Sequence, residues 1–152
     1  MTSMKFVPYE MKTSVISVYS YADKALRGTV TNPYFKDPIA FDNAIQLIMI
    51  IDELQDAINF PLESTRTRSF TPMDDGTSLL ASRKVFSGAD ILARPLASFK
   101  LNIMFRQNSS WQGGLVWIEN HAESQFRSLL ELIMLLDNAL TEAMTKPLPV
   151  QA

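Results

Sequence analysis

The sequence predicts an α+β fold in which one ββα unit occurs twice. The two copies are expected to share an antiparallel sheet of about four strands, with both long helices on one face. The first observation behind this prediction is that residues 13–59 and 98–144 match at a constant offset without a gap. The matched pairs include apolar residues, glycines and aspartates: Ile16 and Leu101, Val18 and Ile103, Gly28 and Gly113, Phe41 and Phe126, Asp52 and Asp137. The second observation is that each copy contains segments typical of strands followed by one long apolar segment typical of a helix.

The first copy begins with two predicted strands. Residues 13–21 are rich in Val, Ile, Ser and Tyr, which favours a strand. Residues 22–25 suit a turn, and residues 26–31 form the second strand. Asn32 and Pro33 end it, because proline cannot donate to a strand ladder.

A helix is expected to follow these strands. Asp37 can cap free amide groups, and Pro38 is tolerated at a first helical position. The predicted helix therefore spans about residues 39–59 and stops before Pro61. Residues 62–95 have no clear hydrophobic pattern and are expected to be an irregular linker between the copies.

The second copy shows a clearer pattern. Apolar and polar residues alternate over residues 99–106, which predicts a strand with one buried face. Residues 107–110 form a turn, and residues 111–118 form the return strand. Ser124 is expected to cap the last helix, which spans residues 125–144.

Both predicted helices are apolar around most of their circumference. A helix that lies on a sheet needs an apolar stripe only somewhat wider than about 100°. Residues 41–58 and 126–144 exceed this width, so each helix must be covered by the sheet and also by another helix. That helix belongs either to the other copy or to a second chain. We therefore expect self-association, most simply as a homodimer.

Length and composition indicate a single domain, residues 1–152, whose core needs no disulfide or metal. The sequence has no cysteine, which excludes thiolate chemistry and Cys-type zinc sites. The net charge of −2 gives no global attraction to nucleic acid or anionic membranes. The longest apolar run, residues 132–136, is far shorter than the ~20 residues of a membrane span. The first residues do not resemble a signal peptide, so we expect a cytoplasmic protein without a cofactor or metal.

Three residues are candidates for acid–base chemistry. His121 is the single histidine and lies in a polar loop, where such a residue is more often solvated than catalytic. Asp52 and Asp137 occupy equivalent places in the two helices and would form a carboxylate pair if they faced each other. The alternative is that each lies on the narrow polar stripe of its own helix, which is the commoner situation. An enzyme that uses these residues is therefore the third-ranked hypothesis.

The favoured hypothesis is a non-catalytic binding or regulatory protein that acts as a homo-oligomer. It would engage a protein partner or a small ligand. The sequence lacks the usual nucleophile, metal and phosphate signatures, whereas self-complementary apolar surfaces are abundant. The expected contact surface combines the polar loop of the second copy with two arginines of the linker: Arg66, Arg68, Arg106, Asn108, Trp111 and Gln112.

The second-ranked hypothesis is a single-stranded nucleic-acid-binding module that uses the open face of the sheet. Aromatic and basic residues on strands can stack bases and contact phosphates. The residues that would do so are Tyr19, Tyr21, Lys100 and Arg106. The net negative charge argues against this alternative.

Two segments of the second copy resemble a family of small uncharacterised bacterial proteins. They are residues 106–113 (RQNSSWQG) and 126–132 (FRSLLEL). The first copy adds further similar positions: Phe41, Leu47, Asp52, residues 59–61 and residues 68–70. The resemblance covers most of residues 13–140 and is strongest over 99–140. It implies a single family-wide domain, and it implies no activity, cofactor or binding residue.

Overall fold

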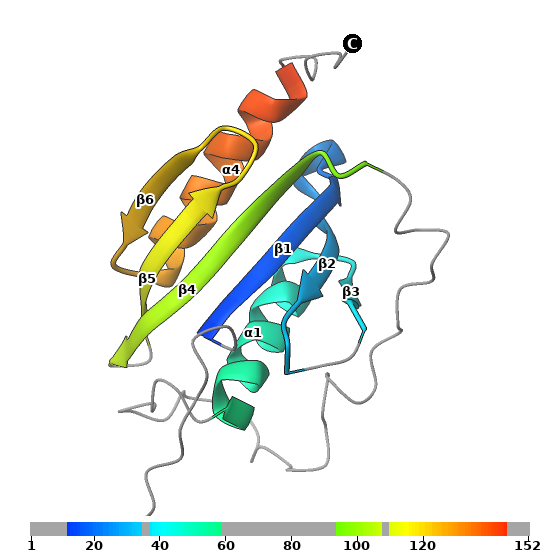
Figure 1. Cartoon of the computed structure of the whole chain (residues 1–152). Coiled ribbons are helices and arrows are strands. Elements are labelled where there is room, and N and C mark those ends of the chain that lie inside the picture. The colour runs from blue at the N-terminus through cyan, green and yellow to red at the C-terminus, as the bar shows by residue number, and fades with distance from the viewer. Residues whose placement is uncertain (1–11, 35–36, 59–93, 108–109, 146–152) are drawn as a thin grey trace, which may run out of the picture.

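The computed structural model describes residues 12–34, 37–58, 94–107 and 110–145. These residues form a six-stranded antiparallel sheet that carries two α-helices on one of its faces (Figure 1). The strand order is β3-β2-β1-β4-β5-β6. The two halves of the chain therefore meet along the central pair, β1 and β4.

Each half contains three strands that precede one α-helix. The first half consists of β1 (Thr13–Ser20), the 3-10 helix η2 (Ala22–Lys24), β2 (Arg27–Thr31), β3 (Ile39–Phe41) and α1 (Ala44–Ile58). The second half consists of β4 (Ala97–Gln107), β5 (Ser110–Trp117), β6 (Ala122–Phe126) and α4 (Leu129–Thr145). Strand pairing follows the same register in both halves. The pairs are Val18 with Gly28, Gly28 with Phe41, Ile103 with Gly113, and Gly113 with Phe126.

The central strand pair has a symmetric register. Ile16 of β1 pairs with Phe99 of β4, and at the equivalent positions Leu101 pairs with Ser14. Exchanging the two halves therefore leaves the pairing unchanged, which is the pattern of an approximate twofold axis through the centre of the sheet. The side chains near this axis come from both halves in equivalent pairs.

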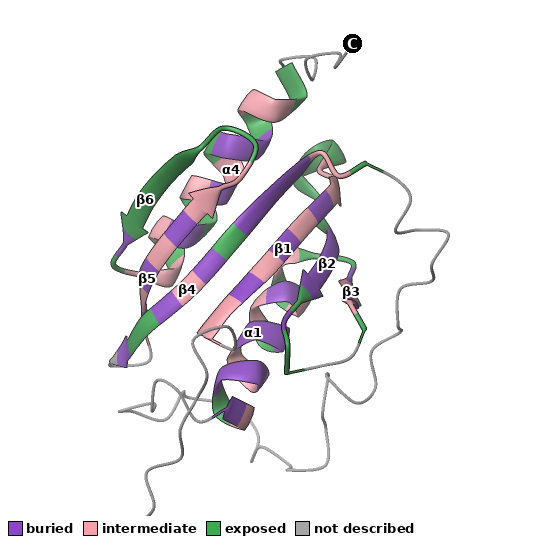
Figure 2. Cartoon of the chain, in the orientation of Figure 1, coloured by how far each residue is buried: buried purple, intermediate pink, exposed green. Residues whose placement is uncertain are grey.

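The predicted α+β class and the two long helices are confirmed, but the four-stranded sheet is wrong. The predicted ββα unit is not confirmed either, because a third strand precedes each helix. Residues 39–41 were expected in a helix, yet Ile39 and Phe41 are buried on one side of a strand that pairs with β2. In the second half, residues 122–126 form β6, where only Phe126 is buried (Figure 2).

Both helices begin later than predicted, because polar residues after the third strand cap them. The Asn43 Oδ1 accepts a hydrogen bond from the Gln46 amide, and the Gln46 side chain accepts one from the Asp42 amide. Ser128 and Glu131 make the equivalent contacts at the start of α4. These reciprocal bonds satisfy amides that lack partners within the helix. Two hydrogen bonds from Arg127 lower the pKa of Glu131. The bond from the Arg127 backbone amide has the larger effect, and the bond from its side chain adds to it.

A bulge in each central strand changes which residues face the helices. The register shifts between Val18 and Ser20 in β1, and between Ile103 and Phe105 in β4. Beyond the second bulge, Phe105 is 49% exposed, whereas the Arg106 side chain is only 2% exposed. Simple alternation predicted the reverse. It fails here because one inserted residue moves every following side chain to the other face.

Two equivalent glycines allow neighbouring strands to approach closely. A Cβ atom on Gly28 would overlap the carbonyl oxygen of Ser17, and one on Gly113 would overlap that of Asn102. Neither oxygen can move away without disturbing the sheet, because both belong to backbone. These two positions therefore require glycine.

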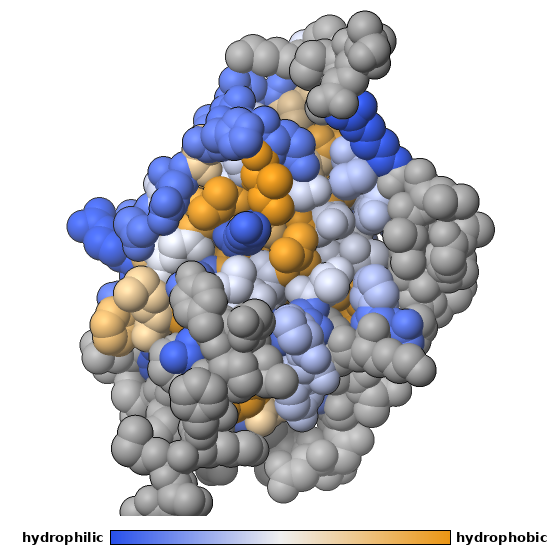
Figure 3. All heavy atoms as spheres, in the orientation of Figure 1, coloured by the Kyte–Doolittle hydropathy of each residue, from blue (hydrophilic) through white to orange (hydrophobic). Residues whose placement is uncertain are grey.

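The core lies between the sheet and the helices. Its largest fully buried side chains come from both halves: Ile16, Phe41, Ile50, Ile51, Leu54, Phe99, Ile103, Phe126 and Leu140. Figure 3 looks onto the opposite face of the sheet, where hydrophobic and hydrophilic residues are interspersed. A groove on that face is lined by polar and apolar residues: Thr13, Lys100, Asn102, Met104, Gly114, Val116, Glu123 and Gln125.

Candidate functional site: a cavity between the two helices

A cavity of about 250 Å³ lies between α1, α4 and the centre of the sheet. Its lining is almost entirely apolar. The sheet side is formed by Ile16, Leu26, Leu101 and Trp111, and the helix sides by Ala44, Leu47, Ile48, Ile51, Leu132, Ile133 and Leu136. Because the two helices stand over different halves of a wide sheet, they leave this space between them rather than closing over it.

The apolar lining is symmetric between the halves. Five pairs of equivalent residues contribute to it: Ile16 and Leu101, Leu26 and Trp111, Leu47 and Leu132, Ile48 and Ile133, Ile51 and Leu136. The cavity therefore lies on the approximate twofold axis. The symmetry ends at the mouth, where the polar lining residues Tyr21, Lys24 and Asp137 are gathered on one side.

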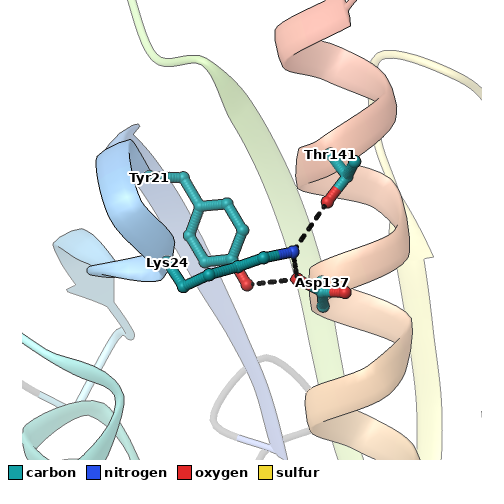
Figure 4. Close-up of polar contacts among 4 residues, drawn as sticks. All are labelled: Tyr21, Lys24, Asp137 and Thr141. Carbon is teal, nitrogen blue, oxygen red and sulfur yellow. Dashed lines mark hydrogen bonds and ion pairs between the residues drawn. The ribbon is translucent and has the colours of Figure 1, made fainter.

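A hydrogen-bonded network forms this mouth (Figure 4). The Tyr21 hydroxyl donates to Asp137 Oδ1 over 2.5 Å, and the Lys24 ammonium donates to the same oxygen over 2.6 Å. Lys24 also lies 3.4 Å from Thr141 Oγ1 and 5.6 Å from the centre of the Tyr21 ring. The Lys24 and Asp137 side chains are 65% and 41% exposed, so the network lies where the cavity meets solvent.

The pKa values at the mouth follow from these contacts. The hydrogen bond from Lys24, followed by the one from Tyr21, lowers the pKa of Asp137. Burial, together with the hydrogen bond and negative charge of Asp137, raises the pKa of Tyr21 from 10.0 to about 12. At neutral pH Asp137 is therefore a carboxylate and Tyr21 a neutral phenol.

The turn that carries Lys24 has an unusual backbone. Asp23 and Lys24 have φ angles of 55° and 62°, in the left-handed region that residues with a Cβ atom seldom adopt. The Ala25 amide donates to the Ala22 carbonyl over 3.0 Å and closes the turn. This geometry directs Lys24 across the mouth toward α4.

A second polar network occupies the equivalent place in the other half. Arg106 Nη1 lies 2.8 Å from Asp56 Oδ1 and 3.3 Å from Asp52 Oδ1. Arg106 is equivalent to Tyr21, and Asp52 is equivalent to Asp137. In both networks the second residue after a bulge binds a carboxylate on the helix of the other half. The bulges are what turn Tyr21 and Arg106 toward the helices.

The candidate acid–base residues lie in separate environments. Asp52 binds Arg106, whereas Asp137 binds Lys24 and Tyr21 at the cavity mouth. His121 is exposed, with a φ angle of 50°, in the turn between β5 and β6. Within the described ranges, no group of three or more His, Asp or Glu residues has the geometry to hold a metal ion.

The residues of the expected contact surface do not share one exposed patch. Arg106 and Trp111 are buried, and Trp111 lines the cavity. Gln112 is half-buried on β5. The remaining three, Arg66, Arg68 and Asn108, lie outside the described residues, as does most of the linker.

The four residues of the expected nucleic-acid face are also divided. Lys100 is exposed in the groove on the open face of the sheet, and Tyr19 lies within the first bulge. Tyr21 and Arg106 instead contact carboxylates on the helices. The prediction placed all four on one face because it did not anticipate the two bulges.

Sequence reasoning missed the roles of Lys24 and Thr141. Lys24 lies 113 positions from Asp137 and 117 positions from Thr141 along the chain, so sequence spacing gave no sign of these contacts. The match between Asp52 and Asp137 was the useful clue, although it indicated two separate networks rather than one carboxylate pair.

No protein-family model, curated protein or solved structure matches this chain. Neither described helix is long and apolar enough to cross a membrane.

Proposed function

We propose that the protein is a binding protein that takes a small, mainly apolar ligand into the cavity between α1 and α4. The observation that carries this proposal is an apolar cavity with polar groups confined to its mouth. Ligand sites commonly combine an apolar lining with a few polar groups that fix orientation. The symmetric lining provides alkyl and aromatic surface for a bound molecule. The mouth provides charged groups at one end of the cavity.

The size of the cavity limits the ligand. A cavity of about 150 Å³ with a similar lining can remain dry and bind benzene. The present cavity, at about 250 Å³, has room for a somewhat larger molecule, such as a short alkyl chain. Leaving it empty forgoes contacts that close packing would supply, so a ligand that fills it stabilises the folded state.

Intrinsic fluorescence provides a direct test, because Trp111 lines the cavity and the only other tryptophan is Trp117. In a Trp117→Phe background, neutral n-octanol is expected to change Trp111 fluorescence in a saturable manner. Leu136→Phe adds volume inside the cavity and should abolish this change. Leu135→Phe is the matched control, because Leu135 is half-buried on the same helix but does not line the cavity. Equal responses in both variants would contradict the proposal.

We also propose that the protein self-associates through the outer faces of its helices. Equivalent apolar residues are exposed on both helices: Ile45 and Leu130, and Met49 and Met134. Ile45 is 70% exposed and Leu130 is 66% exposed, which leaves wide apolar stripes in contact with water. The matched stripes suit a symmetric homodimer, in which the same patch serves both partners. The matched residues on the two helices also favour the interpretation that the chain arose by duplication of one βββα unit.

Sedimentation velocity over a range of protein concentrations tests this second proposal. The wild-type chain is expected to sediment as a dimer at high concentration. Met49→Lys and Met134→Lys together should shift it to a monomer while leaving its circular dichroism spectrum unchanged. Identical sedimentation of the two proteins would argue against dimerisation through these faces.

A further inference from the structure

The mouth of the cavity contains a binding site for an ammonium group, and the chain's own Lys24 occupies it. Three kinds of group surround the Lys24 nitrogen. The Asp137 carboxylate oxygen lies 2.6 Å away, the Thr141 hydroxyl oxygen 3.4 Å away, and the centre of the Tyr21 ring 5.6 Å away. A carboxylate, a hydroxyl acceptor and an aromatic face are each favourable neighbours of a cation.

The acceptors in this site are held more firmly than the lysine. Asp137 and Thr141 belong to α4, and the Tyr21 hydroxyl donates to Asp137 over 2.5 Å. Lys24 instead extends from a three-residue turn, and its side chain is 65% exposed. Ion pairs with this degree of exposure contribute little to stability, so the ammonium can move into solvent at small cost.

The apolar cavity continues directly from this site, because Tyr21, Lys24 and Asp137 are themselves part of its lining. A ligand whose chain fills the cavity therefore places its end group beside Asp137. A positive end group can take the place of the Lys24 nitrogen and keep its contacts. A negative end group meets the Asp137 carboxylate, which is already ionised at neutral pH.

We infer that the ligand class is a primary alkylamine, with its alkyl chain in the cavity and its ammonium in the place that Lys24 occupies. This inference rests on the proposed function and adds the chemical class of the ligand. Lys24 is then a competitor that the ligand displaces, and Asp137 is the group that selects for positive charge.

The test compares three eight-carbon ligands at neutral pH: n-octylamine, n-octanol and octanoate. Trp111 fluorescence in the Trp117→Phe background reports binding of each. The wild-type mouth is expected to bind octylamine about tenfold more tightly than octanol, because the ammonium of octylamine forms an ion pair with Asp137 and the hydroxyl of octanol carries no charge. Octanoate is expected to bind more weakly than octanol.

Two variants separate the roles of the mouth residues. Lys24→Met removes the competing ammonium and should tighten octylamine binding several-fold while changing octanol binding little. Asp137→Asn should remove the preference for octylamine over octanol. Because Lys24 is exposed, the first variant provides a folded protein even if the second is unstable.

The possible outcomes distinguish this inference from the proposed function. If octanol binds and octylamine binds no better, the amine preference is wrong and the cavity proposal stands. If octanoate binds best and Lys24→Met weakens it, Lys24 anchors the ligand and the inference is overturned. If none of the three binds, both the proposed function and this inference fail.

Discussion

Tyr21 and Arg106 occupy equivalent positions but connect the two halves in different ways. Tyr21 is half-buried and donates one hydrogen bond to Asp137, whereas Arg106 is buried and binds both Asp52 and Asp56. The same backbone geometry thus supports a neutral donor beside the cavity mouth and a buried cation in the other network. The Tyr21 network borders the cavity, whereas Arg106, Asp52 and Asp56 do not line it.

The raised pKa of Tyr21 can be measured by its absorbance at alkaline pH. The sequence contains four tyrosines, so the titration of Tyr21→Phe is subtracted from that of the wild type. We expect a midpoint near 12, compared with 10.0 for an ordinary tyrosine. Asp137→Asn should shift this midpoint back toward 10.0, because it removes the negative charge and leaves only the effect of burial.

The same shift determines how stability depends on pH. The folded chain holds the Tyr21 proton more tightly than the unfolded chain, because the pKa of Tyr21 is raised on folding. Its contribution to stability is therefore fully present below pH 10.0 and is lost as the pH rises through about 12. Tyr21→Phe should show a smaller loss of stability over this range, and an equal loss in both proteins would contradict the assignment.

The Arg106 network predicts a large effect when its carboxylates are neutralised. In the double variant Asp52→Asn and Asp56→Asn, the buried guanidinium loses the negative charge of both carboxylates. We expect this change to lower the free energy of unfolding by about 3 kcal/mol, measured by urea denaturation. Arg27→Gln is the control, because Arg27 and Asp42 form an exposed pair at 3.7 Å, and its loss should cost less than about 1 kcal/mol. A similar loss of unfolding free energy in the two proteins would show that the burial of Arg106 does not make its ion pairs more important for stability.

At the scale of elements, the strands and helices with strong hydrophobic patterns could be predicted from sequence. The expected strands 13–21 and 99–106 correspond closely to β1 and β4. The short outer strands could not be predicted in the same way. β3 has three residues, and β6 has one buried residue in five, so neither carries enough alternation to identify a strand.

The faces of the central strands were also beyond simple sequence reasoning. A bulge leaves no compositional mark in either strand, yet it decides whether Arg106 faces water or the helices. The matched glycines gave a partial signal, because both lie opposite the residue that precedes a bulge. Their requirement for close backbone contact follows only from the strand register.

Those glycines support a prediction at the level of the sheet. Gly113→Ala places a Cβ against the Asn102 carbonyl oxygen and should lower the free energy of unfolding by about 3 kcal/mol. Gly114→Ala is the matched control in the same strand. The three atoms nearest to its Cβ would all belong to the Gln125 side chain, the closest at 3.3 Å, and this side chain is able to move. Thermal denaturation of the two variants measures the difference, and equal melting temperatures would contradict the close approach.

At the scale of the whole molecule, the cavity is a consequence of how the two halves are joined. Each helix covers its own half of the sheet, and the apolar surfaces that face the axis come from both. The sequence showed that the helices were too apolar for one sheet face alone. It could not show the distance between them, because that distance depends on a sheet with six strands rather than four. The mouth residues could not be predicted from the sequence either, because they come from opposite halves of the chain.

Ala44 offers a way to test whether the cavity is kept open at a cost in stability. Ala44 lines the cavity near the start of α1, and the equivalent residue in α4 is Leu129. Ala44→Leu should fill part of the space, raise the melting temperature of the unliganded protein and weaken n-octanol binding at least tenfold. Added apolar contact contributes roughly 1 kcal/mol or more when it fills a void without strain.

The matched control for this variant is Ala143→Leu. Ala143 is half-buried against the core on α4 but does not line the cavity, so the same added volume should leave n-octanol binding unchanged. A more stable Ala44→Leu protein with weaker binding would mean that the unfilled volume serves a ligand rather than the fold. A less stable protein with unchanged binding would mean that the space near Ala44 is already packed, and that the ligand lies elsewhere.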